Sequence, residues 1–244
     1  MGRTGDITWG IPSEHREHGG KVMAGPVPRK CHSAISMGRT GDITWGTPSE
    51  HREHGGKVMA GPVPIRGYLK IEGAARAFGF DFKDKTVLDI GSSTGGFTEY
   101  ALEHGARKVI AVEKGSHQMK APLRFDPRIE LHEKTDIFDF TLEKEIDTVV
   151  ADVSFLSLTK VLAYLKNIPN KNANFLMMLK PQFEASPKEL RNGVVKNETI
   201  RRQIIKRFES WLKQNGYIVI KKHDNTLHGK TGNIERFYYF KLAK

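Results

Sequence analysis

The sequence predicts an α/β fold in which a doubly wound, mostly parallel sheet ends in an antiparallel hairpin. From residue 65 onward, runs rich in β-branched residues alternate with segments of helical periodicity, which is the pattern of successive βαβ units. The first strand leads into a glycine-rich turn, as in folds that bind a ligand at the carboxyl edge of the sheet. The last two strand-like runs are joined by a polar loop without room for a crossover helix, so they should pair antiparallel.

The strands and helices follow one another in a regular order. The predicted strands are 85–90, 107–113, 128–133, 146–152, 174–180, 216–222 and 234–242. The predicted helices are 97–104, 156–167 and 197–214. A parallel sheet that finishes in a hairpin is the arrangement associated with class I S-adenosylmethionine-dependent methyltransferases, an analogy of fold that does not by itself fix the function.

The helix expected at 197–214 is strongly amphipathic. Its apolar stripe consists of Ile200, Ile204, Phe208, Trp211 and Leu212. Its other face carries Arg201, Arg202, Lys206 and Lys213. We expect these four cations to form a solvated helix face, with nucleic-acid binding as the alternative.

The composition is that of a folded protein with a basic surface. Of the 244 residues, 38% are hydrophobic and 27% are charged, close to globular averages. The 39 Lys and Arg residues outnumber the 28 Asp and Glu residues, so the net charge is +11. This charge favours a polyanionic partner such as nucleic acid, although a merely basic soluble protein is an alternative.

Two further features limit the possible protein classes. Cys31 is the only cysteine, which excludes an intramolecular disulfide and a multi-cysteine zinc site and fits a reducing compartment. No apolar run approaches the roughly 18 to 20 residues of a membrane helix, and the N-terminal residues lack the apolar core of a secretory signal. We therefore expect a cytoplasmic protein without a membrane segment.

Residues 1–64 differ from the rest of the chain. Residues 1–28 recur at 37–64, with Ile11 of the first copy replaced by Thr47 in the second. The segment contains no Leu, Phe or Tyr but holds half of the 24 glycines, so it cannot build much of a core. We expect a poorly ordered extension at 1–64 and one folded domain at 65–244.

Two histidine pairs in this extension are candidate metal ligands. His15 and His18, repeated as His51 and His54, stand three residues apart and would share one face of a helix. Two glycines follow each pair and no third ligand is evident, so we predict no metal site.

The segment 87–97 predicts a cofactor site. Its glycines let the backbone approach a ligand closely, and their spacing differs from the G-x-G-x-x-G pattern of dinucleotide-binding folds, which favours a ligand without phosphates. The residues of this segment expected at the site are Asp89, Gly91, Ser92, Gly95, Gly96 and Phe97.

Three acidic residues near strand ends suit S-adenosylmethionine. Asp89 would balance the cationic methionine portion, and Glu113 would accept hydrogen bonds from the ribose hydroxyls. Asp136 would face the adenine amino group. The alternative for each is a solvated carboxylate at a strand end.

Five ordered motifs at 87–113, 151–158, 179–186, 192–198 and 232–237 resemble the TlyA, or haemolysin A, family of FtsJ-like ribose methyltransferases. The resemblance covers essentially all of 65–244. It implies 2′-O-methylation of ribosomal RNA at cytidine, with S-adenosylmethionine as donor and ribosomal RNA or ribosomal subunits as partner. The N-terminal RNA-binding domain usual in that family is missing or degenerate here, and Tyr68 stands where the family has a second small residue.

The same resemblance implies a catalytic Lys-Asp-Lys-Glu tetrad. Matching the motifs places it on Lys70, Asp152, Lys180 and Glu235. A ribose hydroxyl is a poor nucleophile at neutral pH, so a base must take its proton, and Lys180 is the expected base. The segment after Asp152 lacks the Pro-Pro-aromatic turn of amino-group methyltransferases, which disfavours methylation of a base nitrogen.

Two other functions stay open. One is a non-catalytic RNA-binding protein that kept the methyltransferase fold, and the other is a membrane-active haemolysin. The second requires a spanning segment or a strongly apolar amphipathic helix, and the sequence contains neither.

Overall fold

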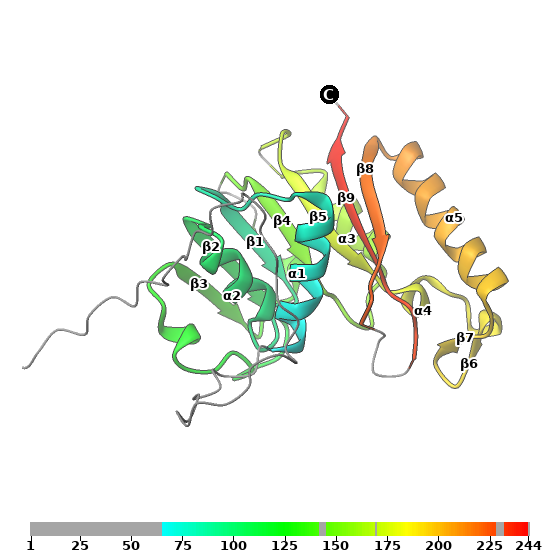
Figure 1. Ribbon diagram of the computed structural model, residues 1–244, viewed down its shortest axis with the longest axis horizontal. Coiled ribbons are helices and arrows are strands. Elements are labelled where there is room, and N and C mark those ends of the chain that lie inside the picture. Colours follow the sequence, from blue (N-terminus) through cyan, green and yellow to red (C-terminus); the bar gives the residue numbers. More distant parts are fainter. Residues whose placement is uncertain (1–64, 142–144, 169, 228–231, 244) are drawn as a thin grey trace, which may run out of the picture. The chain divides into compact units, whose positions relative to one another are not determined.

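The computed structural model describes residues 65–141, 145–168, 170–227 and 232–243 (Figure 1). The expectations for the repeat, the poorly ordered extension at 1–64 and the two histidine pairs concern residues outside these ranges.

A seven-stranded mixed sheet forms the centre of the described domain, in the order β3-β2-β1-β4-β5-β9-β8 (Figure 1). Its strands are β1 (Thr86–Ile90), β2 (Lys108–Glu113), β3 (Ile129–Glu133), β4 (Thr148–Ala151), β5 (Asn174–Leu179), β8 (Tyr217–Asp224) and β9 (Arg236–Leu242). The pairs among β1 to β5 are parallel, whereas β9 is antiparallel to both β5 and β8. The predicted doubly wound sheet and its terminal hairpin are therefore confirmed, and each strand boundary lies within two residues of the prediction.

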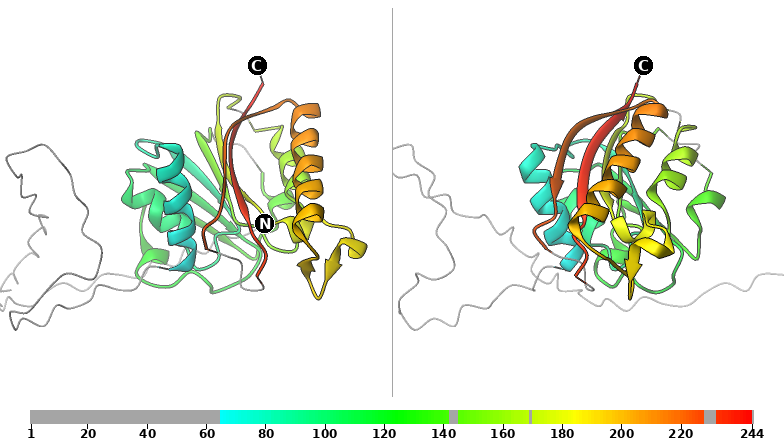
Figure 2. Two further views of the ribbon diagram at one scale, coloured as in Figure 1. Left: turned by 45° about the vertical axis from the view of Figure 1, so that its right-hand side comes forward. Right: turned by 90° about the vertical axis from the view of Figure 1, so that its right-hand side faces the viewer.

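Helices cover both faces of this sheet (Figure 2). The α-helices are α1 (Arg66–Phe78), α2 (Gly96–Glu103), α3 (Leu158–Leu165), α4 (Pro181–Glu184) and α5 (Glu198–Gln214). On one face, Val87 of β1 packs in a core with residues of α1 and α2. On the other face, Leu88 packs with residues of α3 and α5. The strand period of two thus sends neighbouring side chains into separate cores, as a two-sided sheet requires.

The prediction for the cations of α5 is wrong at one position. Arg202, Lys206 and Lys213 are exposed as expected, but Arg201 is buried. Its guanidinium donates to Asp224 on β8 and to the carbonyl of Ile234, so it is compensated inside the fold. Burial of a charge is tolerated when such partners are present.

The sequence analysis missed a small hairpin beside the main sheet. Strands β6 (Leu190–Arg191) and β7 (Val194–Val195) pair antiparallel around Asn192 and Gly193, which have φ angles of 51° and 75°. An Asn-Gly pair is the strongest short-range signal for a two-residue hairpin turn, so the sequence did carry the information. Three short 3-10 helices complete the described elements, η1 (Leu123–Phe125), η2 (Ile137–Asp139) and η3 (Pro187–Glu189).

Candidate active site

The four tetrad residues come from four different elements. Lys70 lies on α1, Asp152 follows β4 directly, and Lys180 follows β5 directly. Glu235 precedes β9, and because β9 is antiparallel to β5, its beginning lies at the carboxyl edge of the parallel strands. Open α/β sheets bind their ligands at this edge.

The tetrad side chains form a chain of alternating charges. The Nζ of Lys70 lies 2.7 Å from Oε2 of Glu235 and 3.7 Å from Oδ2 of Asp152. The Nζ of Lys180 lies 2.6 Å from Oδ1 of Asp152. Asp152 therefore stands between the two ammonium groups, with one carboxylate oxygen toward each.

The two halves of this chain, Glu235 with Lys70 and Asp152 with Lys180, differ in burial. The Glu235 and Lys70 side chains are 4% and 7% exposed, whereas those of Lys180 and Asp152 are 10% and 21% exposed. The inner pair is enclosed by the fold, and the outer pair is the one that a substrate can reach. Each charge keeps an opposite partner, which buried ionic groups require.

The amine of Lys180 has two further neighbours that sequence reasoning missed. It donates to Oγ of Ser154 at 2.7 Å, and it lies 5.9 Å from the ring centre of Phe183. Phe183 in turn contacts Phe155, whose ring centre is 5.2 Å away. Phe155 is 93% exposed at a φ of 61°, a backbone conformation that is uncommon for a bulky residue. Phe155 lies within the motif at 151–158, but the sequence analysis assigned it no role.

A pocket of about 610 Å³ adjoins the tetrad at Asp152. It extends along the carboxyl ends of β1, β2, β3 and β4. Its lining residues are Ile90, Gly91, Ser93, Val112, Glu113, Lys114, Gln118, Thr135, Asp136, Ile137, Asp152, Val153, Ser154, Phe155 and Leu156. The volume lies within the range of about 300 to 1,000 Å³ that is typical of small-molecule sites.

Glu113 and Asp136 line this pocket and are held in place by hydrogen bonds. Glu113 accepts from the backbone N–H groups of Ser93 and Gly115. Asp136 accepts from Lys114, and this hydrogen bond holds the pKa of the Asp136 carboxyl below its usual value. These hydrogen bonds orient both carboxylates at the pocket wall.

Gly91 connects the pocket to the tetrad. Its φ is 77°, and a Cβ at this position would lie 3.3 Å from the carbonyl oxygen of Asp152. A glycine thus lets the end of β1 approach the segment that follows β4.

The other residues expected at the cofactor site lie behind the pocket. Asp89 is fully buried under α2 and accepts a hydrogen bond of 2.6 Å from Oγ1 of Thr98. Burial raises the pKa of Asp89 to about 7, an effect that the Thr98 hydrogen bond partly offsets. Ser92 is also buried, and Phe97 belongs to the core beneath α1 and α2.

The remaining two glycines are needed for packing. A Cβ on Gly96 would lie 2.5 Å from the backbone nitrogen of Tyr68, so this glycine permits the close approach of α1 and α2. Gly95 lies against Leu123 and Met119. Ligand contact by Gly95 and Gly96 stays a prediction, and the structure shows the protein neighbours of each.

Tyr68, which departs from the family pattern, packs outside the tetrad. Its hydroxyl donates to Glu103 at 2.6 Å, and its ring meets Tyr100 edge to face. These contacts belong to the interface between α1 and α2.

Comparisons with known proteins identify the family of the chain. The FtsJ-like methyltransferase family matches residues 64–242. A relative from Campylobacter jejuni, named 23S rRNA (cytidine-2′-O)-methyltransferase TlyA, is 36% identical over 177 residues. The match covers 72% of this chain and 69% of that protein.

Solved structures show the same fold. A candidate hemolysin from Lactococcus lactis is 32% identical, with a TM-score of 0.69 over 72% of this chain and 87% of that chain. A candidate S-adenosylmethionine-dependent methyltransferase from Listeria monocytogenes, at 16% identity, has a TM-score of 0.55 over 73% of this chain and 99% of that chain. Among the described residues, no helix has the length and apolar character needed to cross a membrane.

Proposed function

Because the chain belongs to the FtsJ-like methyltransferase family, we propose that it methylates the 2′-hydroxyl of a cytidine ribose in ribosomal RNA, with S-adenosylmethionine as donor. The observation that carries the proposal is the charge chain from Glu235 through Lys70 and Asp152 to Lys180, which ends beside the pocket.

The pocket fits the proposed cofactor in size and in chemistry. Glu113 would accept hydrogen bonds from the ribose hydroxyls, and Asp136 would face the adenine end. Ile90, Val112 and Ile137 supply apolar walls for a planar ring. Bound S-adenosylmethionine would supply an electrophilic methyl group on its sulfonium. Asp89, Ser92, Gly95, Gly96 and Phe97 shape the loop and helix behind the pocket.

Lys180 is arranged to act as the base. To act as the base, the Lys180 ammonium first releases one proton to solvent, which leaves an amine with two protons and one lone pair. The amine donates to Oγ of Ser154 and lies 2.6 Å from Oδ1 of Asp152, and these two contacts would orient a deprotonated amine so that its lone pair can take the proton of a ribose hydroxyl. The proton taken from the hydroxyl then passes from Lys180 to solvent.

The other tetrad members position this base. Asp152 fixes the direction of the Lys180 amine, and Lys70 holds the second oxygen of Asp152. Glu235 neutralises Lys70 in the interior. None of these three needs to exchange a proton during the reaction.

Methyl transfer from radiolabelled S-adenosylmethionine tests the proposal. The full chain is incubated with naked 16S and 23S ribosomal RNA and with assembled ribosomal subunits, and nuclease digestion identifies the labelled nucleoside. The expected product is 2′-O-methylcytidine. Label in a base, or no transfer to any of these RNAs by a protein that binds the cofactor, would contradict the proposal.

A further inference from the structure

A second feature at the carboxyl edge of the sheet lies outside the tetrad and the pocket. We name residues 186–197, which include η3, β6 and β7, the basic hairpin. It follows α4, the short helix that begins directly after Lys180. It projects at the N-terminal end of α5, at the same edge of the sheet as α4 (Figures 1 and 2). The tetrad and the basic hairpin therefore lie at the same edge of the sheet, with α4 between Lys180 and the hairpin.

The basic hairpin carries uncompensated positive charge. Lys188, Arg191 and Lys196 are exposed, and their side chains have no ion-pair or hydrogen-bond partner among the described residues. The acid of the segment, Glu189, is already neutralised by two hydrogen bonds from Arg207, at 2.8 and 2.9 Å. These bonds hold the pKa of Glu189 at about 2. The hairpin thus presents three free cations and no free anion.

The hairpin is held in one conformation although it contributes nothing to either core. None of its residues belongs to the two buried clusters. Instead, the buried Asn233 donates to the carbonyl of Gly193 and accepts from the N–H of Val195, which fixes the two-residue turn. Side chains on a fixed backbone lose less entropy on binding than those on a mobile loop.

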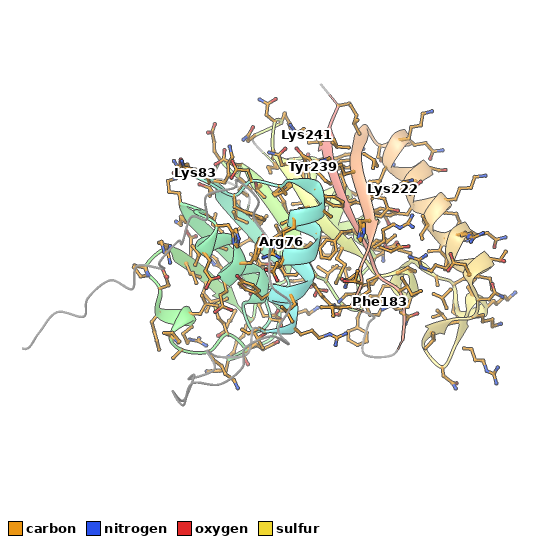
Figure 3. The ribbon with its side chains drawn as sticks, viewed as in Figure 1. Arg76, Lys83, Phe183, Lys222, Tyr239 and Lys241 are labelled. Atoms are coloured by element: carbon orange, nitrogen blue, oxygen red, sulfur yellow. The ribbon has the colours of Figure 1, made fainter. Side chains whose placement is uncertain are left out.

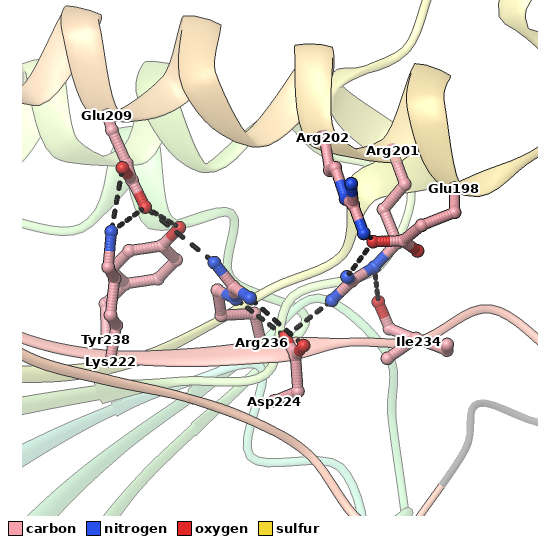
Figure 4. A network of polar contacts seen from close by, with 9 residues as sticks. All are labelled: Glu198, Arg201, Arg202, Glu209, Lys222, Asp224, Ile234, Arg236 and Tyr238. Atoms are coloured by element: carbon pink, nitrogen blue, oxygen red, sulfur yellow. Dashed lines mark hydrogen bonds and ion pairs between the residues drawn. The ribbon is translucent and has the colours of Figure 1, made fainter.

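The anchors of the hairpin also hold the segment that carries Glu235. Asn233 stands two residues before Glu235, and the carbonyl of Ile234 between them accepts from the buried Arg201. Arg201 also donates to Asp224 (Figure 4). Arg236, the residue after Glu235, donates to the same carboxylate from the other side. The turn of the hairpin and the inner end of the tetrad are thus attached to one polar network.

We propose that the basic hairpin binds the phosphate backbone of the RNA substrate next to the nucleotide whose ribose reaches Lys180. The inference rests on the proposed function for the identity of the substrate. Three fixed cations without a matching anion suit a ligand with regularly spaced negative charges, and the phosphates beside a target ribose meet this condition. An acidic protein surface is the competing ligand that the experiment separates.

The test replaces the three cations and compares the result with an equal charge change elsewhere. The hairpin variant is Lys188→Gln/Arg191→Gln/Lys196→Gln. The control variant is Lys83→Gln/Lys213→Gln/Lys241→Gln. Lys83 precedes β1 and Lys241 lies near the end of β9, both at the opposite edge of the sheet (Figure 3), and Lys213 lies in the last turn of α5. They too have no side-chain partner among the described residues.

Fluorescence anisotropy of the full-length variants with a labelled 20-nucleotide single-stranded RNA gives the affinity at several salt concentrations. We expect the hairpin variant to bind roughly tenfold more weakly at about 0.1 M salt, with a slope of log K against log salt that is shallower by about 2. The control variant should lose much less affinity. In the methylation assay, the hairpin variant should show a raised KM for RNA with a nearly unchanged kcat and unchanged cofactor affinity.

Two results would overturn the inference. One is RNA binding that both variants weaken equally, which would indicate a general charge effect. The other is unchanged RNA binding by the hairpin variant. If the hairpin variant in that second case also loses binding of a labelled poly-glutamate peptide, the surface is assigned to an acidic protein. Because binding is measured without turnover, a chain that binds RNA through the hairpin but methylates none would contradict the proposed function alone.

Discussion

The tetrad and the basic hairpin both place cationic side chains at the same edge of the sheet, but these cations differ in burial and in their ion-pair partners. In the tetrad, Lys70 and Lys180 are nearly buried and each contacts a carboxylate. In the hairpin, Lys188, Arg191 and Lys196 are exposed and contact no carboxylate in the part of the chain that the structure describes. The difference indicates that compensated cations are arranged for chemistry at one atom, whereas uncompensated cations are arranged to attract a polyanion.

The sharpest way to test this contrast is to remove the base. Lys180→Ala should lower methyl transfer by at least about a hundredfold, because general-base catalysis contributes roughly 10² to 10⁴. Lys180→Arg should be equally inactive, since arginine keeps the charge but cannot give up a proton at accessible pH. Both variants should bind S-adenosylmethionine normally in calorimetry. Near-normal turnover by Lys180→Arg would reduce Lys180 to a positioning residue.

Breaking the buried ion pair between Lys70 and Glu235 tests whether the charge of Lys70 must be neutralised for the protein to be stable. Glu235→Ala leaves the buried Lys70 without its nearest partner and should lower the free energy of unfolding by roughly 3 kcal/mol, as for other broken buried pairs. Chemical denaturation measures the loss. The double variant Lys70→Met/Glu235→Leu, which removes both charges, should be more stable than Glu235→Ala while remaining inactive. Equal losses for the two variants would show that the unpaired charge is not the cause.

Asp89 offers a third case, a buried acid without a cationic partner. A carboxyl whose pKa rises from 3.8 unfolded to about 7 folded stabilises the fold while protonated, and this stability is lost as the pH rises from about 4 through 7. Asp89→Asn should remove that dependence, with a difference on the order of 2 to 4 kcal/mol across this window. Urea denaturation of both proteins at pH 5 and pH 7.5 gives the comparison. Parallel pH profiles would place the titration elsewhere.

The positions of the strands were easier to predict from the sequence than the contacts between buried polar side chains. Strands such as Thr86–Ile90 are continuous apolar runs between loops, so they are recognisable without tertiary information. The tetrad residues followed from motifs, but their contacts depend on which strand ends meet at one edge. Arg201 was misassigned because helical periodicity places it among solvated cations, and its partner Asp224 lies on a strand 23 residues later. A side chain at position 96 would clash with the backbone of Gly67 and Tyr68, and this contact between two helices is not encoded in any local sequence pattern.

The smallest expected effect concerns the rigidity of the basic hairpin. Arg207→Gln/Glu189→Gln removes the ion pair that anchors the segment while leaving the net charge and the three free cations unchanged. The new glutamine at 189 can still accept from Ser186, so the change in unfolding free energy should stay below about 1 kcal/mol, as for exposed pairs. RNA affinity should fall about two- to threefold, because a less rigid hairpin loses more conformational entropy when it binds RNA. The slope of log K against log salt should be unchanged, because the number of cations that face phosphate is the same. Anisotropy titrations at three salt concentrations measure both quantities. In the parent protein this ion pair should persist at pH 5 and weaken as the pH falls from about 4.5 toward 2, because the pKa of Glu189 is depressed in the fold. A shallower slope in the double variant would mean that Arg207 itself contacts the RNA, and the RNA-binding surface would then extend from the basic hairpin onto α5.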